Sequence, residues 1–95
     1  LVYSSSYDVP VDKVISVLHE VANDEKRIIK DNPDMPITIT LNKHNASSLD
    51  YIFRAWVKKE DYLDAMFACN ANVKKYFDKN NIEIPYNKLD LYMKK

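Results

Sequence analysis

The sequence of 95 residues has the length of one domain, and its 14 Lys and Arg balance its 14 Asp and Glu. This balance argues against a nucleic-acid-binding module and against an electrostatic membrane anchor, because both use a clustered basic excess. A single cysteine excludes an intrachain disulfide, and the absence of glycine excludes glycine-rich phosphate-binding loops.

The N-terminal part predicts a strand followed by a helix. Leu1–Tyr7 predicts a short strand in which Leu1, Tyr3, Ser5 and Tyr7 share one side, although three consecutive serines weaken its β propensity. We place the first helix at about Val9–Asn23, with Asp8 as its N-cap and Pro10 in its first turn. Its apolar stripe follows helical spacing and consists of Val11, Val14, Ile15, Leu18, Val21 and Ala22.

Two further strands follow a polar, proline-containing connection. Ile37–Leu41 alternates apolar and polar residues and predicts the second strand. The third strand lies in Ser47–Tyr62, the stretch around which the chain is organised, and its alternation predicts burial on one side. The residues on the predicted buried face are Leu49, Tyr51, Phe53, Ala55 and Val57.

The C-terminal part predicts a second helix and a fourth strand. The helix runs over about Asp61–Lys79, with an apolar stripe of Tyr62, Ala65, Met66, Cys69, Val73, Tyr76 and Phe77. Asn70 interrupts this stripe. Asn81 is expected to adopt the left-handed conformation that ends the helix, since no glycine is available. Leu89, Leu91 and Met93 alternate with polar residues and predict the fourth strand.

The order β-α-β-β-α-β predicts an α+β domain over residues 1–95 with a ferredoxin-like fold. In this fold a four-stranded antiparallel sheet carries two helices on one face. The opposite face would hold the candidate interface residues Ile52, Arg54, Trp56 and Tyr92. We expect a partner surface to cover that face, because Ile52 and Trp56 would otherwise lie in water. The alternative is that they are ordinary scattered apolar surface residues.

No residue pattern in the sequence predicts catalysis, a metal site or a cofactor. His19 and His44 lack further ligands at metal-site spacing, so both are expected at the surface. Cys69 falls among apolar residues and is expected in the core. His44, Ser47, Ser48 and Asp50 include the residue types of a catalytic triad, but positions so close in one turn cannot supply its geometry.

Short matches spread along nearly the whole chain carry a family resemblance. They are Tyr7-Asp8, Val11–Val14, Arg27–Asp31, Ala46–Leu49, Arg54–Trp56, Ile82–Tyr86 and Leu89–Leu91. In this order and spacing, the chain resembles the C-terminal cytoplasmic α/β domain of the small-conductance mechanosensitive channel (MscS-type) family. It differs from the family at Asn45 and Asn81, where glycine is common, and at Asn70, where an apolar residue is usual.

The resemblance implies a non-catalytic domain in the wall of a hollow cytoplasmic vestibule. Its partners would be other copies of itself in a homo-heptameric channel at the inner membrane, which opens under tension and releases solutes on osmotic downshock. The pore helices, the upper β-domain and a final barrel strand would lie outside this chain. It begins with Leu1 rather than Met and has no apolar run of membrane-spanning length, so we expect a soluble fragment that meets the membrane only through those missing helices.

Two other function classes stay open at this point. One is a small-ligand-binding regulatory domain on the ferredoxin-like fold, which a metabolite bound in a cleft between strands would favour. The other is a generic oligomerisation module. An apolar helix encoded upstream of this segment would favour the channel instead. No cofactor and no nucleic-acid partner are predicted.

Overall fold

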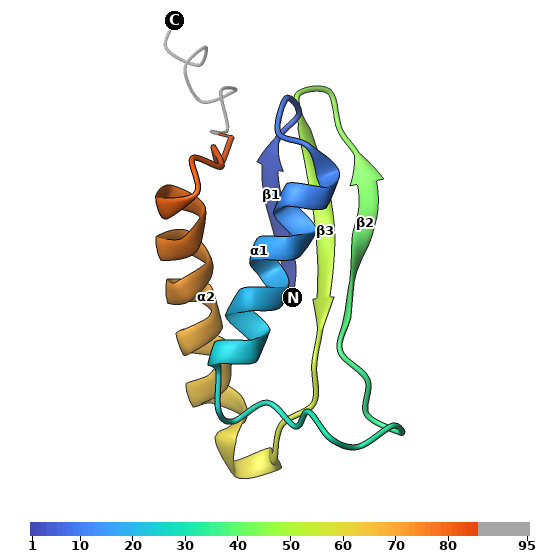
Figure 1. Ribbon diagram of the computed structural model, residues 1–95, viewed down its shortest axis with the longest axis vertical. Coiled ribbons are helices and arrows are strands. Elements are labelled where there is room, and N and C mark those ends of the chain that lie inside the picture. The colour runs from blue at the N-terminus through green and yellow to red at the C-terminus, as the bar shows by residue number, and fades with distance from the viewer. Residues whose placement is uncertain (86–95) are drawn as a thin grey trace, which may run out of the picture.

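The computed structural model describes residues 1–85. Its elements follow the order β1 (Val2–Ser6), α1 (Val11–Asp24), β2 (Thr38–His44), β3 (Ser48–Arg54), a single 3-10 turn (Lys59–Asp61) and α2 (Tyr62–Lys79), as Figure 1 shows. This matches the predicted order from the first strand to the second helix. The predicted fourth strand, Leu89–Met93, lies outside the described residues, which form a sheet of three strands.

In the sheet, β3 lies between β1 and β2 and runs antiparallel to both. Tyr51 pairs with Tyr3 on one side and with Leu41 on the other. The prediction ended the second strand at Leu41, but β2 continues to His44 through a bulge between Leu41 and Lys43. Asn42 is the extra residue that this bulge accommodates.

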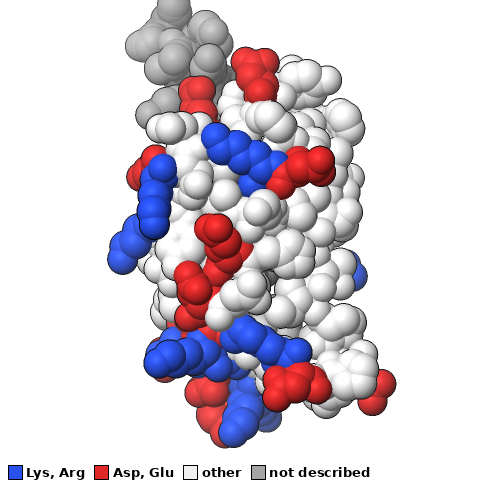
Figure 2. Space-filling view, in the orientation of Figure 1, with Lys and Arg blue, Asp and Glu red and all other residues white. Residues whose placement is uncertain are grey.

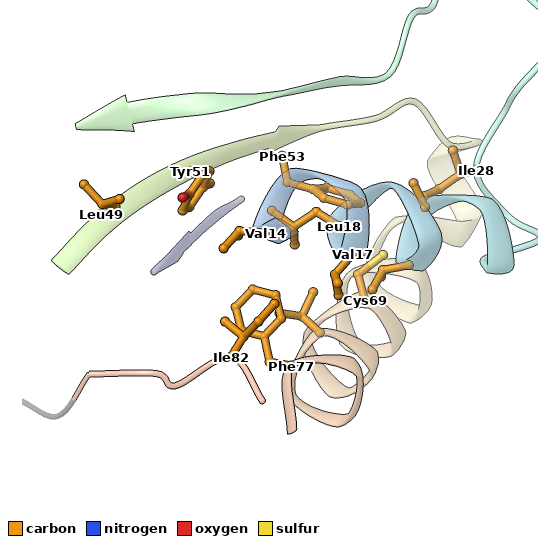
Figure 3. Close-up of a cluster of buried hydrophobic side chains, with 13 residues drawn as sticks. Val14, Val17, Leu18, Ile28, Leu49, Tyr51, Phe53, Cys69, Phe77 and Ile82 are labelled. Carbon is orange, nitrogen blue, oxygen red and sulfur yellow. The ribbon is translucent and has the colours of Figure 1, made fainter. Parts of the chain in front are cut away.

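Both helices lie on the same side of the sheet and close one core (Figures 1 and 3). From β3 the core receives Leu49, Tyr51 and Phe53, as the period-two pattern predicted. The helices contribute the buried side chains Val14, Val17, Leu18, Val21, Ala22, Cys69, Val73 and Phe77. Tyr3 packs edge-on against Phe53, with ring centroids 5.8 Å apart.

The start of α1 differs from the prediction. Pro10 occupies the N-cap position, its ψ of 138° is extended, and no side chain caps the helix. Because the helix begins at Val11, Asp8 lies two residues before the cap and does not serve as the N-cap. Instead, the chain turns tightly here, since the Val9 N–H donates to the Ser6 carbonyl at 3.2 Å.

The end of α2 confirms the predicted role of Asn81, whose φ is 59°. The Ile82 N–H donates to the Phe77 carbonyl at 2.8 Å, and the Asn81 N–H donates to the Asp78 carbonyl at 3.3 Å. These two bonds form a Schellman motif, which satisfies the last carbonyls of the helix. The turn also buries Ile82 against Phe77, so the C-terminal end of α2 is closed by its own chain.

Candidate interface

The sheet face turned away from the helices is polar in its upper part, where β1 ends and β3 begins in Figure 1. Asp50 lies between Ser4 of β1 and Lys43 of β2. The Ser4 hydroxyl donates to Asp50 Oδ1 at 2.5 Å. This hydrogen bond, together with one from the Asn45 side chain, lowers the pKa of the Asp50 carboxyl. The upper part of the face therefore holds a carboxylate at neutral pH.

Lower on the same face lie the residues predicted as an interface. Ile52 is half-buried between Val2 and Thr40. Arg54, paired with Thr38, is exposed and forms no ion pair within residues 1–85. The strand alternation thus brings Ile52 and Arg54 onto one face, as predicted. Tyr92, the fourth predicted member, lies outside the described residues.

Trp56 is not part of the sheet, although the strand pattern placed it on this face. β3 ends at Arg54, and Trp56 lies two residues further along the chain. It is 50% exposed. Its carbonyl accepts a hydrogen bond of 2.8 Å from the Ile29 N–H, which fixes its backbone to the loop after α1. Trp56 therefore stands at the lower end of the sheet, partly open to solvent.

Next to Trp56 is a groove of about 490 Å³ between the end of β3 and the start of α2. Its walls include Phe53, Ala55 and Trp56 on one side and Tyr62, Ala65 and Met66 on the other. Tyr62 is 59% exposed, although the helical stripe assigned it to the core. Leu63 and Phe67, which lie outside that stripe, are also exposed.

Sequence reasoning missed this groove. Its walls come from residues far apart in the chain, with Leu1 at one side, and no local period reports such a combination. The sequence does show two large apolar residues off the predicted buried stripe of α2, Leu63 and Phe67, but neither of them lines the groove. Exposed apolar residues gathered at one place indicate an interaction surface.

Charges of both signs surround the loop below α1, where Figure 2 shows Lys and Arg interleaved with Asp and Glu. A second hollow of about 540 Å³ there is lined by Lys26, Arg27, Lys30, Asp31, Lys58 and Asp61, among others. Arg27 forms an ion pair of 2.9 Å with Glu25, which raises the pKa of its guanidinium. The ammonium group of Lys30 donates to the carbonyls of Glu25 and Ile28. The side chains of Arg27 and Lys30 therefore help to fix the loop.

The other residues considered for chemistry are dispersed. His19 is exposed on α1, and His44 packs edge-on near Tyr7. Cys69 is buried in the core, and burial raises the pKa of its thiol. Within residues 1–85, no group of three or more His, Cys, Asp or Glu side chains is arranged to hold a metal ion. None of the helices described for this chain is both long and apolar enough to cross a membrane.

Asn70, the polar residue in the predicted stripe of α2, is exposed rather than buried. Its side-chain oxygen accepts a hydrogen bond of 2.8 Å from the Tyr3 hydroxyl. Desolvation raises the pKa of that Tyr3 hydroxyl, so it stays a proton donor at neutral pH. The bond connects α2 directly to β1.

Comparison with known proteins gives consistent similarities along the chain. Residues 1–84 match the family described as "Mechanosensitive ion channel MscS, C-terminal". An MscS family protein of Buchnera aphidicola is 39% identical over 90 residues, covering 95% of this chain and 31% of that protein. The small-conductance mechanosensitive channel of Edwardsiella ictaluri is 34% identical over 93 residues, covering 98% of this chain and 32% of the channel.

A solved structure shows the same arrangement. The closed-state structure of MscS from Helicobacter pylori aligns with a TM-score of 0.78 and 28% identity. The alignment covers 100% of this chain and 38% of that one. The chain thus spans about a third of the length of the relatives it matches.

Proposed function

Because this chain belongs to the MscS family of mechanosensitive ion channels, we propose that it forms part of the wall of the channel's cytoplasmic vestibule. In this role it is a structural and assembly domain without catalytic activity. The channel that contains it opens under membrane tension and releases solutes on osmotic downshock.

One observation carries this proposal, namely that the similarity extends over the whole chain in both sequence and structure. The family match covers residues 1–84, and the H. pylori channel aligns with all of the chain. A shared fold by itself would not specify function. Here, however, sequence identity of 34% to a small-conductance mechanosensitive channel accompanies the fold.

The proposed partners are other copies of this chain in a homo-heptamer on the cytoplasmic side of the inner membrane. Ile52, Arg54 and Trp56, with Tyr92, would form a surface that a neighbouring subunit or the subunit's own upper domain covers. The half-buried Ile52 and half-exposed Trp56 support this assignment, because both would gain burial on contact. Contact with the membrane would be made by helices elsewhere in the subunit.

The four-stranded ferredoxin-like sheet also stands as a proposal. The order β1-β3-β2 leaves the outer edge of β1 open for a further strand. At that outer edge, the Ser6 N–H donates a hydrogen bond of 2.7 Å to the Glu83 carbonyl. This bond brings the chain after α2 alongside β1. A fourth strand at Leu89–Met93 would protect the Ser4 amide from hydrogen exchange. That protection should then disappear when the chain is truncated after Pro85.

A chimeric channel tests the proposed function. Residues 1–84 of this chain would replace the matching segment of the E. ictaluri channel, in cells that lack their own mechanosensitive channels. We expect the chimera to assemble in the membrane, to respond to tension in patch recordings and to protect cells from osmotic downshock. As a control, the same chimera carrying Tyr51→Asp should lose protection, because it places a charge in the core. A chimera that assembles normally but never opens under tension would contradict the proposal.

A further inference from the structure

The segment that follows β3 has one paired edge and one open edge. On one edge, Val57 forms an isolated antiparallel bridge with Ile28, and the Trp56 carbonyl accepts from Ile29. On the other edge, Phe53 is the last residue with a backbone partner within residues 1–85. It exchanges two backbone hydrogen bonds with Leu1, of 3.1 Å from the Leu1 amine and 2.9 Å to the Leu1 carbonyl.

Backbone groups of an extended chain alternate in direction, so Ala55 points its N–H and C=O toward the same edge as Phe53. Neither group of Ala55 forms a backbone hydrogen bond within residues 1–85. Ala55 itself is only partly exposed and lies in the wall of the groove beside Trp56. The groove therefore contains an unpaired strand edge as well as apolar side chains.

This combination fits an extended polypeptide better than a compact ligand. An added strand obtains its affinity from main-chain hydrogen bonds to an open edge and from side-chain contacts beside it. Here the edge is supplied by Ala55, and the contacts are supplied by Trp56, Tyr62 and Met66. Leu63 and Phe67, in the same half of α2, are also exposed, although they do not line the groove.

We propose that this groove holds the polypeptide that precedes Leu1 in the full-length channel subunit. The proposal rests on the proposed function, since that subunit supplies the upstream polypeptide. The antiparallel register of β1 and β3 determines the pairing. Continuing from the Leu1–Phe53 pair, the first upstream residue lies opposite Arg54 and the second lies opposite Ala55. The second residue then exchanges two hydrogen bonds with Ala55, and the upstream polypeptide covers Trp56.

Hydrogen exchange at a single amide tests this pairing. The 95-residue chain is compared by NMR with the same chain extended by its ten native upstream residues, any tryptophan among them being changed to phenylalanine. We expect exchange of the Ala55 amide to slow by about 100-fold or more in the extended chain, as for an amide that joins a stable ladder. The Ser4 amide, on the opposite edge of β1, serves as the control and should not change. Quenching of Trp56 fluorescence by iodide should decrease in parallel.

Equal exchange of Ala55 in the two chains would overturn the proposal. So would protection of Ala55 that appears in the 95-residue chain and grows with its concentration, because a second copy would then occupy the groove. Neither measurement uses channel activity. A chimera that fails to open would therefore contradict the proposed function alone, whereas an unprotected Ala55 would contradict the groove assignment alone.

Discussion

The two halves of α2 differ in how completely they are packed. In the C-terminal half, Val73 and Phe77 are buried and the Schellman turn at Asn81 folds Ile82 onto the same core. In the N-terminal half, Tyr62, Leu63 and Phe67 are more than half exposed, and no side chain caps the first turn. The C-terminal half, which we call the closed half, is packed against this chain alone. The N-terminal half, which we call the open half, exposes apolar side chains of the kind found at interaction surfaces.

The largest expected effect comes from a matched pair of phenylalanines on this helix. Phe77→Ala should reduce the free energy of unfolding by about 3–5 kcal/mol, because Phe77 is 0% exposed and its truncation leaves a cavity in the core. Phe67→Ala should change it by less than about 0.5 kcal/mol, because Phe67 is 60% exposed. Urea denaturation followed by circular dichroism measures both.

If Phe77→Ala does not fold, Phe77→Leu provides the same comparison with a smaller loss of stability, because leucine leaves a smaller cavity than alanine. Equal destabilisation by Phe67→Ala and Phe77→Ala would show that the two halves of α2 are packed alike in solution.

The cap at the closed end gives the next effect. Asn81→Val should destabilise the domain by about 1–2 kcal/mol, because a β-branched residue is disfavoured at the φ of 59° found there. Asn81→Gly is the control and should preserve or raise the melting temperature, since glycine adopts this conformation without strain. An Asn81→Val variant that melts with the wild type would rule out the left-handed cap.

The sheet face turned away from the helices gives a smaller, pH-dependent effect. The lowered pKa of Asp50 means that its carboxylate stabilises the fold fully above the ordinary value of about 3.9, and that this contribution is lost as pH falls through the folded-state pKa. Ser4→Ala should therefore cost about 0.5–1.5 kcal/mol at pH 7 and progressively less below about pH 4. Urea denaturation at several pH values measures this loss.

Ser6→Ala provides the matched control, because Ser6 pairs with Ser48 rather than with a carboxylate. Its effect should be small and independent of pH. A Ser4→Ala penalty that is constant from pH 7 to pH 3 would show that the hydrogen bond does not depend on the charge of Asp50.

The last prediction concerns the fluorescence of Trp56 and involves no change in stability. Trp56 is the only tryptophan and is 50% exposed, so iodide should quench its fluorescence readily in the monomeric 95-residue chain. Phe77→Leu leaves this region unchanged and should give the same quenching. Strong protection of Trp56 in a monomer confirmed by light scattering would mean that the groove is closed without any further polypeptide.

Features set by residues close together in the sequence were predictable from the sequence alone. The alternation around Tyr51 identified the buried face of β3, because successive side chains of a strand point to opposite faces and one-sided burial gives apolar residues at every second position. The absence of glycine, together with the end of the helical pattern, identified Asn81. The resemblance identified the family from short matches in order.

The starts of the two helices and the contacts between distant residues were not predictable. Asp8 has the chemistry of an N-cap, but α1 begins only at Val11. Val9 precedes Pro10, and the residue before a proline is disfavoured in the helical conformation, so Asp8 does not occupy the N-cap position. Tyr62 obeys the helical period, yet it is the first residue of α2, which begins at the lower end of the molecule in Figure 1. Its side chain is 59% exposed. The groove requires Leu1, Ala55 and Met66 together, which only the tertiary fold provides.

The position of β3 between its two neighbours has a consequence for the order of folding. β2 and β3 are joined by a short turn in which the Asn45 N–H donates to the Ser48 carbonyl, so this hairpin closes with little loss of chain entropy. β1 pairs with β3 only across the whole of α1 and the connection after it, so its docking closes a much longer loop. The hairpin should therefore form early, and β1 should dock afterwards onto its free edge. During synthesis, all of β1 leaves the ribosome before its partner exists, and it must wait for β3 to complete the sheet.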